Sequence, residues 1–276
     1  IASCLVGSEM CIRDRCRDSP IRNLEDIYES GDVVIEEVVV DEQGRTYISG
    51  YFEYEITLGE HTIETPQGEK SVFIARMAYD GTWDWLRGLN GTTIINDMVV
   101  SKQGDAYIVG DYYGQSIIWG DSNISWNCDS GNYYKAYLAK VLNNGDYDWI
   151  NAFCNENTNF YIDSIALVEG DSDELSNIYI AGGAKNGYGW NRVQVNSLTE
   201  NRYCFYADGS GFEGYVINLN TTGICSGLNN DVQQIYLNGP NSGTNPDMGH
   251  KWLEISEIIY EGGEIYISGD FSGELT

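Results

Sequence analysis

Basic side chains are scarce in this chain of 276 residues, with 15 Lys and Arg against 42 Asp and Glu and a formal net charge of -27. A surface this acidic repels phosphate backbones and anionic lipid headgroups, so we expect no nucleic-acid partner and no membrane-surface partner. The sequence also lacks an apolar run of the length that spans a bilayer, so we expect no membrane insertion.

Histidine is nearly absent, and the two present, His61 and His250, lie in separate polar loops. A nucleophilic triad needs a positioned base, and neither residue has the setting of one. No phosphate-cradling Gly loop and no His-Glu-x-x-His helix occurs, and paired carboxylates are too common to discriminate. We therefore expect no catalytic residues in this chain and no enzymatic activity of its own.

Residues 4–15 (CLVGSEMCIRDR) resemble the in-frame translation of a transposase-type sequencing adapter, a string found at the ends of reading frames assembled from environmental nucleic acid. We set this segment aside as an artefact, with a degraded signal peptide as the alternative. Residues 1–32 are then expected to be artefact and poorly structured lead-in. The natural start and end of the protein are both expected to be missing, so the absence of a signal peptide carries no information.

Cysteine is also scarce, and its positions bear on disulfide formation and metal binding. Cys4 and Cys11 belong to the adapter-like segment and Cys16 lies at its edge, which leaves four cysteines, an even number that allows disulfides in an exported chain. We predict the pairs Cys128–Cys154 and Cys204–Cys225, with buried free thiols in a cytosolic protein as the alternative. The cysteines are singly spaced, which argues against zinc.

The tetrapeptide Tyr-Ile-x-Gly occurs four times, starting at Tyr47, Tyr107, Tyr179 and Tyr266. Each copy follows an apolar stretch and a polar turn, which is the signature of a β-hairpin. A third strand ending in a turn closed by Gly follows at residues 73–81, 137–145 and 215–223. A fourth strand is expected at residues 83–86, 147–150 and, without the aromatic residues of the other two, 224–226. The chain is therefore predicted to be an array of four-stranded units.

Four short antiparallel strands per unit is the plan of a propeller blade. From about residue 33 to residue 276 the chain resembles the SBBP type of β-propeller repeat, which reads apolar-x-Asp-x-x-Gly-x-x-Tyr-x-x-Gly, then Phe-(Ile/Val)-Ala-Lys, then Gly-x-x-x-Trp. Residues 39–50, 73–76 and 81–85 match it, as do residues 99–110, 137–140 and 145–149. The resemblance implies an all-β fold, a partial β-propeller of three four-stranded antiparallel blades plus the first hairpin of a fourth.

Two departures from that pattern direct the search for function. The connections between second and third strands are long, and the third unit carries an insertion at residues 186–204. Variable connections on a constant scaffold are where individual function is expected. Trp119, Trp126 and Trp190 lie in or beside these segments and are our candidate ligand-binding residues, with local packing as the alternative. The repeated Trp85 and Trp149 are instead expected to pack between blades.

Two acidic turns are candidates for binding Ca2+, through Asp80 and Asp84 in one and Asp146 and Asp148 in the other. Neither follows the full calcium-loop pattern, and turn formation by Asp is the alternative.

These observations predict a non-enzymatic binding or structural module of a secreted or cell-surface microbial protein, with a protein or carbohydrate ligand. Two alternatives stay open. One is the propeller portion of an extracellular polysaccharide-active enzyme whose catalytic residues lie elsewhere, and the other is a calcium-stabilised adhesin.

Overall fold

The computed structural model describes residues 27–29, 33–65, 70–120, 122–125, 134–154, 159–170, 175–185, 191–197, 201–207, 212–225, 232–235, 237–238, 253–271 and 274–275. All regular secondary structure in these ranges is β-strand, labelled β1 to β21, and the predicted all-β class is confirmed. Within these same ranges no helix has the length and apolar character that a membrane crossing requires.

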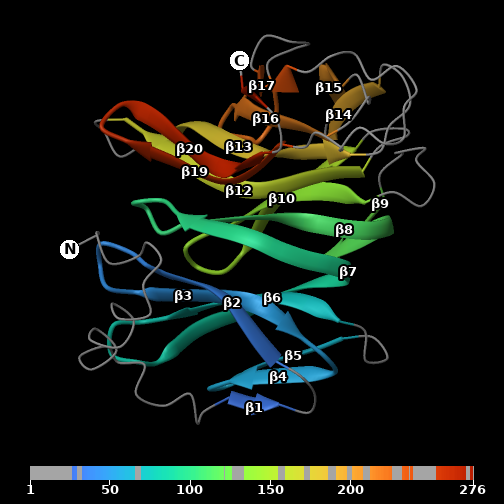
Figure 1. Cartoon of the computed structure of the whole chain (residues 1–276). Helices are drawn as coiled ribbons and strands as arrows, with labels where there is room; N and C mark the ends of the chain where they lie inside the picture. The colour runs from blue at the N-terminus through green and yellow to red at the C-terminus, as the bar shows by residue number, and fades with distance from the viewer. Residues whose placement is uncertain are drawn as a thin grey trace.

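The strands form a pile of antiparallel layers (Figure 1). The first group consists of β2 (Val33–Val40), β3 (Thr46–Phe52), β6 (Ser71–Met77) and the first half of β7 (Trp83–Val100), each strand paired with the next. The second group consists of the second half of β7, β8 (Ala106–Trp119), β10 (Lys135–Val141) and β11 (Tyr147–Cys154). Both groups have the strand order that the sequence predicted.

β7 differs from the sequence expectation, which had separate last and first strands here. Its 18 residues close the first group and open the second, so the two groups share one sheet. The strand bends instead of breaking because its pairing with β8 shifts register twice, between Asn90 and Thr92 and between Ile95 and Asp97. Such bulges change the direction of a strand while keeping its ladder.

The third group contains β12 (Asn159–Glu169), β13 (Leu175–Lys185), β16 (Phe212–Leu219) and β17 (Val232–Ile235). The fourth strand expected at residues 224–226 is wrong. The amide of Ile224 donates to the side chain of Asn220, and Cys225 forms a disulfide with Cys204. Residues 224 and 225 therefore lie outside the sheet, and the strand that pairs with β16 is β17. A fourth hairpin follows, formed by β19 (Leu253–Glu261) and β20 (Glu264–Phe271).

The remaining strands cover edges and faces of this pile. In the insertion, β14 (Asn191–Asn196) and β15 (Asn201–Ala207) form a hairpin that pairs with β11. β1 (Ile27–Glu29), β4 (Glu55–Leu58) and β5 (His61–Glu64) make a small sheet, so the expected lead-in contains a strand. β9 (Ser122–Ser125) pairs with β8, and β18 (Leu237–Asn238) pairs with β21 (Glu274–Leu275).

The hydrophobic core lies between the layers, in successive clusters. One cluster joins the β4 side chains Ile56 and Leu58 to the first group, and the next joins the first group to the second. A third cluster joins the second and third groups, and a small one joins the third group to the β19–β20 hairpin through Ile255 and Ile258. Each layer is therefore stabilised by burial against its neighbours.

The glycine of Tyr-Ile-x-Gly is required by a close backbone contact. A Cβ on Gly50, Gly110 or Gly182 would overlap a carbonyl oxygen of the neighbouring first strand, that of Val34, Ile94 or Tyr161 respectively. The first and second strands of each group shift register next to this point, at Ile35/Glu37, Ile95/Asp97, Ile162/Ser164 and Ile255/Glu257. The bulge thus turns a carbonyl over the glycine, and an alanine has no room there.

Neighbouring groups are also joined by side chains of the last strand. Trp85 Nε1 donates to the carbonyl of Asn143 (3.1 Å), and the indole ring lies edge-on to Tyr47, with ring centroids 6.1 Å apart. In the next group the Trp149 ring lies against Gly223 and edge-on to Tyr107, again at 6.1 Å. The expectation that these two tryptophans pack between units is confirmed.

Replacement of Gly110 by alanine tests the close contact. We expect Gly110→Ala to lower the free energy of unfolding by about 3 kcal/mol or more, because the added Cβ meets a backbone carbonyl that cannot move without breaking the ladder. Gly88→Ala in β7 is the matched control, since its Cβ would meet only side-chain atoms, the end of Ile63 at 3.3 Å and Oδ1 of Asn90 at 3.5 Å. Urea unfolding of both variants measures the difference, and equal midpoints would contradict this account of the glycine.

Candidate functional site

Three neighbouring tyrosines, Tyr113, Tyr134 and Tyr161, form what we call the tyrosine cluster. The ring centroids of Tyr113 and Tyr134 lie 5.4 Å apart, and those of Tyr134 and Tyr161 lie 6.1 Å apart. Tyr113 is 39% exposed and Tyr134 is 45% exposed, so two adjoining rings are open to solvent. An exposed aromatic surface of this kind offers both an apolar face and a hydroxyl group to a ligand.

The fold places these rings just beyond the point where the pairing of β8 with β10 ends, at Tyr112 and Lys135. Tyr113 lies within β8, opposite Thr92 of β7, and Tyr134 directly precedes β10. Tyr134 is fixed to the start of β12, because it donates its amide to Asn159 Oδ1 (2.8 Å) and accepts from the amide of Phe160 (3.1 Å). Its ring is therefore held beside Tyr161.

Lys135 anchors the same region from beneath. Its side chain is buried, and Nζ donates to the carbonyl of Gly114 at 2.5 Å while lying 5.5 Å from the ring centroid of Tyr112. Burial lowers the pKa of Lys135. This contact joins the residue after Tyr113 to the residue after Tyr134, and so holds the two exposed rings together.

Two carboxyl groups, Asp111 and Asp163, lie next to the cluster. Asp111 is 4% exposed and accepts a hydrogen bond from Asn96 Nδ2 (3.0 Å), whereas its Oδ1 has no hydrogen-bond partner. Burial raises the pKa of Asp111 to about 7, and the charge of Asp163 adds to this effect. Burial is the main cause that raises the pKa of Tyr161 to about 12, and the charges of Asp111, Tyr134 and Asp163 contribute.

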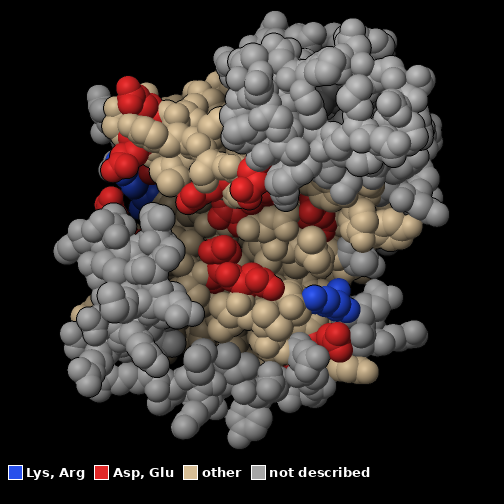
Figure 2. Space-filling model, viewed as in Figure 1, with Lys and Arg blue, Asp and Glu red and all other residues tan. Residues whose placement is uncertain are grey.

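Acidic side chains gather in a band across the middle of the face shown in Figure 2, over β7, β12 and β19. Asp97 in β7 accepts from Ser164 Oγ (2.6 Å) and from the amide of Ile165 (2.9 Å), and Ser164 Oγ accepts from the amide of Ile258 (3.2 Å). These bonds connect the second, third and fourth groups. Asp97 is partly buried, and this burial raises its pKa.

The equivalent residue of the first group, Glu37, is also an acid. Burial raises the pKa of Glu37 to about 7, and the charges of Asp97 and Glu36 contribute. The bulge positions of successive groups therefore bring carboxylates close together, with Asp97 as the shared neighbour. At neutral pH this part of the molecule holds protons that an unfolded chain would release.

Trp119 lies in the core. It is 5% exposed and packs edge-on against Tyr147, with ring centroids 4.6 Å apart, so it presents no open face for stacking on a ligand. Trp119 therefore has the role given as the alternative to ligand binding, which is local packing. Trp126 and Trp190 fall outside the described residues.

The four candidate calcium ligands are engaged in local contacts. Asp80 accepts from the amide and hydroxyl of Thr82 in its own turn, and these hydrogen bonds lower its pKa. Asp84 pairs with Arg76 (2.8 Å), Asp148 pairs with Lys140 (3.1 Å), and Asp146 accepts from Asn144. Across the part of the chain that the structure describes, no three His, Cys, Asp or Glu side chains are grouped as a metal ion would need.

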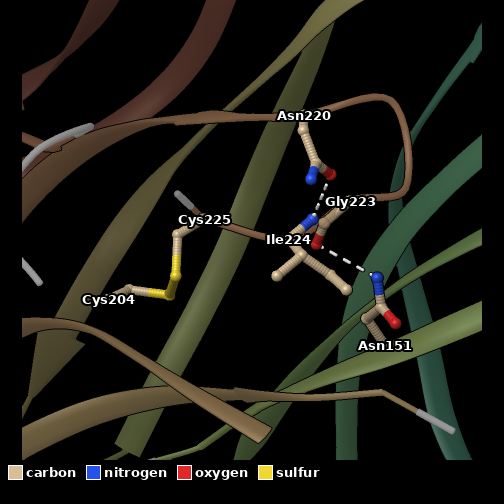
Figure 3. The surroundings of a disulfide bond; sticks show 6 residues. All are labelled: Asn151, Cys204, Asn220, Gly223, Ile224 and Cys225. Atoms are coloured by element: carbon tan, nitrogen blue, oxygen red, sulfur yellow. Dashed lines mark hydrogen bonds between the residues drawn. A yellow bond between two sulfur atoms is a disulfide. The ribbon is translucent and has the colours of Figure 1, made fainter. Parts of the chain in front are cut away.

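A disulfide joins Cys204 in β15 to Cys225 after β16, with the two Cα atoms 5.7 Å apart (Figure 3). The predicted pairing of these two cysteines is confirmed. Asn151 of β11 donates to the carbonyl of Gly223 (3.0 Å) just before Cys225, so the disulfide region is also held to the second group. Cys154 is disulfide-bonded as well, and its predicted partner Cys128 lies outside the described residues.

The sequence alone did not predict the tyrosine cluster, and the candidate ligand-binding residues were instead Trp119, Trp126 and Trp190. A usable signal was present, because Tyr113 and Tyr134 flank one of the long connections between second and third strands that the sequence identified as variable. What no local pattern could show is that Tyr161, from the next group, would meet them.

A scan against protein-family models finds no match, and a comparison with curated proteins finds none either. The resemblance to the SBBP type of repeat therefore stays a prediction.

The buried carboxyl groups predict a stability that falls as pH rises. Because the folded pKa values of Glu37 and Asp111 are raised to about 7, the stability they contribute is complete below the unfolded pKa near 4 and is lost as pH rises through 7. We expect a lower melting temperature at pH 8 than at pH 5.5, with the loss from Asp111 on the order of a few kcal/mol.

Substitution separates this effect from the general repulsion of an acidic surface. Asp111→Asn and Glu37→Gln should each flatten the pH dependence of the melting temperature, whereas Glu42→Gln, at an exposed position, should leave it unchanged. An unchanged slope in Asp111→Asn, in thermal melts monitored by circular dichroism, would refute the assignment.

Proposed function

We propose that this chain is a non-enzymatic binding module, part of a β-propeller carried by a secreted or cell-surface microbial protein, and that its tyrosine cluster binds neutral carbohydrate. The observation that carries the proposal is the pair of adjoining, solvent-exposed rings of Tyr113 and Tyr134. The third ring of the cluster, Tyr161, lies near the carboxyl group of Asp163. Aromatic rings stack on the apolar face of a sugar ring, and a carboxylate accepts hydrogen bonds from its hydroxyl groups.

The charge of the molecule favours neutral glycans within this class. With a net charge of -27 and an acidic band across one face, the chain repels uronic and sulfated polysaccharides. Neutral sugars suffer no such repulsion. Adjoining exposed rings fit the side of an extended glycan chain, which supports adhesion as the role of the module.

Several features support a β-propeller that belongs to an exported protein. Successive groups with the same strand order, the same bulge and the same glycine contact are what blades of a propeller would have. The Cys204–Cys225 disulfide supports an exported protein, because such bonds persist in oxidising surroundings. The polysaccharide-active alternative is favoured by one observation, a carboxyl group with a pKa of about 7, Asp111, close to a second carboxyl group, Asp163.

Affinity electrophoresis through gels that contain a neutral polysaccharide, xylan or laminarin, tests the proposal, with alginate as the acidic comparison. We expect retardation in at least one neutral gel and none in alginate. Tyr134→Ala should weaken binding about fivefold or more, since a stacked aromatic contact contributes about 1 kcal/mol or more. Tyr79→Ala is the matched control, because Tyr79 is 74% exposed and lies outside the cluster.

Two outcomes would count against the proposal. Equal retardation of Tyr134→Ala and the unchanged chain would remove the cluster as the binding surface, and free migration in every neutral gel would remove the carbohydrate ligand. Release of reducing ends that Asp163→Asn abolishes would replace the binding module with the polysaccharide-active alternative.

A further inference from the structure

The three rings of the tyrosine cluster are tilted to one another, so they do not form a flat platform. The planes of Tyr113 and Tyr134 meet at 54°, with ring centroids 5.4 Å apart, and those of Tyr134 and Tyr161 meet at 32°. The face of an aromatic ring carries a negative partial charge, which attracts a cation within about 6 Å of the ring centroid. A cation bound over Tyr113 and Tyr134 is therefore in range of both rings.

Two carboxyl groups lie close to these rings. Asp111 and Tyr113 are alternate residues of β8, and alternate residues of a strand face the same side of the sheet. Asp163 of β12 lies near enough to Asp111 for its charge to raise the pKa of Asp111, after the larger effect of burial. Oδ1 of Asp111 is buried without a hydrogen-bond partner, so this oxygen keeps its capacity to interact with a positive group.

The tyrosine hydroxyl groups around this pair of acids experience a negative potential. Burial is the main cause that raises the pKa of Tyr161, and negative charges, that of Asp111 first among them, add to the effect. The pKa of Tyr215 in β16 is raised by burial and then by Asp163 and Asp111, and that of Tyr137 in β10 by burial and then by Asp111. The boundary between the second and third groups therefore attracts positive charge.

Lys135 does not place its charge on this side of the sheet. It is paired with Tyr112, and its Nζ lies 5.5 Å from the ring centroid of Tyr112 and donates to the carbonyl of Gly114. Tyr112 and Tyr113 are successive residues of β8, so they face opposite sides of the sheet. The side that carries the exposed rings thus presents carboxyl groups and ring faces, and both favour a cation.

The chemistry of the surface indicates which kind of cation fits. A metal ion needs several oxygen ligands, and among the residues that the structure describes no three His, Cys, Asp or Glu side chains are grouped for one. A quaternary ammonium group instead carries its charge beneath methyl groups, which make apolar contacts with ring faces while the charge is attracted to them. Exposed rings next to carboxyl groups match both properties.

We propose that the tyrosine cluster, together with Asp111 and Asp163, binds a quaternary ammonium group of the kind that choline carries. The ring faces contact the methyl groups, and the two carboxyl groups compensate the charge. This is a second class of ligand for the cluster. It uses the same rings as the carbohydrate proposal but depends on the charge of the ligand and not on a sugar ring, so the two can be tested separately.

Choline and neohexyl alcohol, its uncharged carbon isostere, are matched probes of the same shape. Titration of the full chain at constant ionic strength, followed through the tyrosine ring signals by NMR, measures both affinities. We expect saturable binding of choline, and binding of the isostere that is weaker by about fivefold or more, because only choline has a charge for the rings and carboxylates to attract. Equal affinities of the two probes, or no binding of choline, would overturn the proposal.

Protein variants separate the rings from the general acidity of the surface. Tyr134→Ala should weaken choline binding about fivefold or more although it leaves every carboxylate in place, whereas Tyr134→Phe, which keeps the ring, should retain it. Tyr79→Ala, at a ring that is 74% exposed outside the cluster, should leave the affinity unchanged. If Tyr134→Ala bound choline as tightly as the unchanged chain, attraction to the acidic surface alone would explain the binding, and the cluster would not be its site.

The pH dependence of the affinity tests the carboxyl groups. The charge of choline does not change with pH, so any change in affinity comes from groups of the protein. Because Asp111 has a pKa of about 7 and its ionised form favours a bound cation, we expect the affinity to rise about threefold as pH increases through this value. Asp111→Asn should remove the rise, and a flat profile in the unchanged chain would contradict the part that the proposal gives to Asp111.

Two further comparisons identify the source of the group and separate the two proposals. We expect no cosedimentation with phosphatidylcholine vesicles, because the acidic band repels the headgroup phosphates, so that choline binding indicates a soluble or polymer-bound ligand. Cosedimentation that free choline reverses would support the proposal with a lipid headgroup as the source. Retardation in neutral polysaccharide gels without choline binding would remove this inference alone, and choline binding without retardation would remove the carbohydrate proposal alone.

Discussion

The structure depends on one close contact within each of the first three groups of strands, between a carbonyl oxygen of the first strand and the glycine of the second. The register shift beside this contact recurs in all four groups, and in the first three the glycine leaves space for the carbonyl. In two groups a third-strand tyrosine then donates its hydroxyl group to the same oxygen. A carbonyl that the bulge removes from the ladder thereby regains a partner, which a buried backbone group requires.

The same bulge explains why polar residues lie so deep between the layers. It presents the side chains of Asn96, Asp97 and Ser164 to the neighbouring group, where they form hydrogen bonds with the backbone of Ile162, Ile165 and Ile258 respectively. Each of these bonds fixes the position of one group on the next, which apolar packing alone would leave free to slide. The cost is electrostatic, because carboxyl groups are held close together with raised pKa values.

Sequence alone could predict the parts of this fold that local chemistry determines. Turns closed by Gly44, Gly104, Gly145 and Gly223 have the positive φ expected of them, and the strands on either side are where the alternation of residues placed them. The continuity of β7 could not be predicted, since Gly91 and Asn90 are equally typical of a turn. Nor could the late fourth strand of the third group, because a disulfide and a side-chain cap, not residue preference, take residues 224–225 out of the sheet.

The sequence could predict only part of the candidate site, because residues of the next group orient one of its side chains. Tyr113 and Tyr134 belong to one group, but the contacts that orient Tyr134 come from Asn159 and Phe160, at the entry to the next. A surface made at the boundary between two groups depends on how they stack. Stacking depends on the bulge contacts, so the exposed rings are positioned by residues that never touch a ligand.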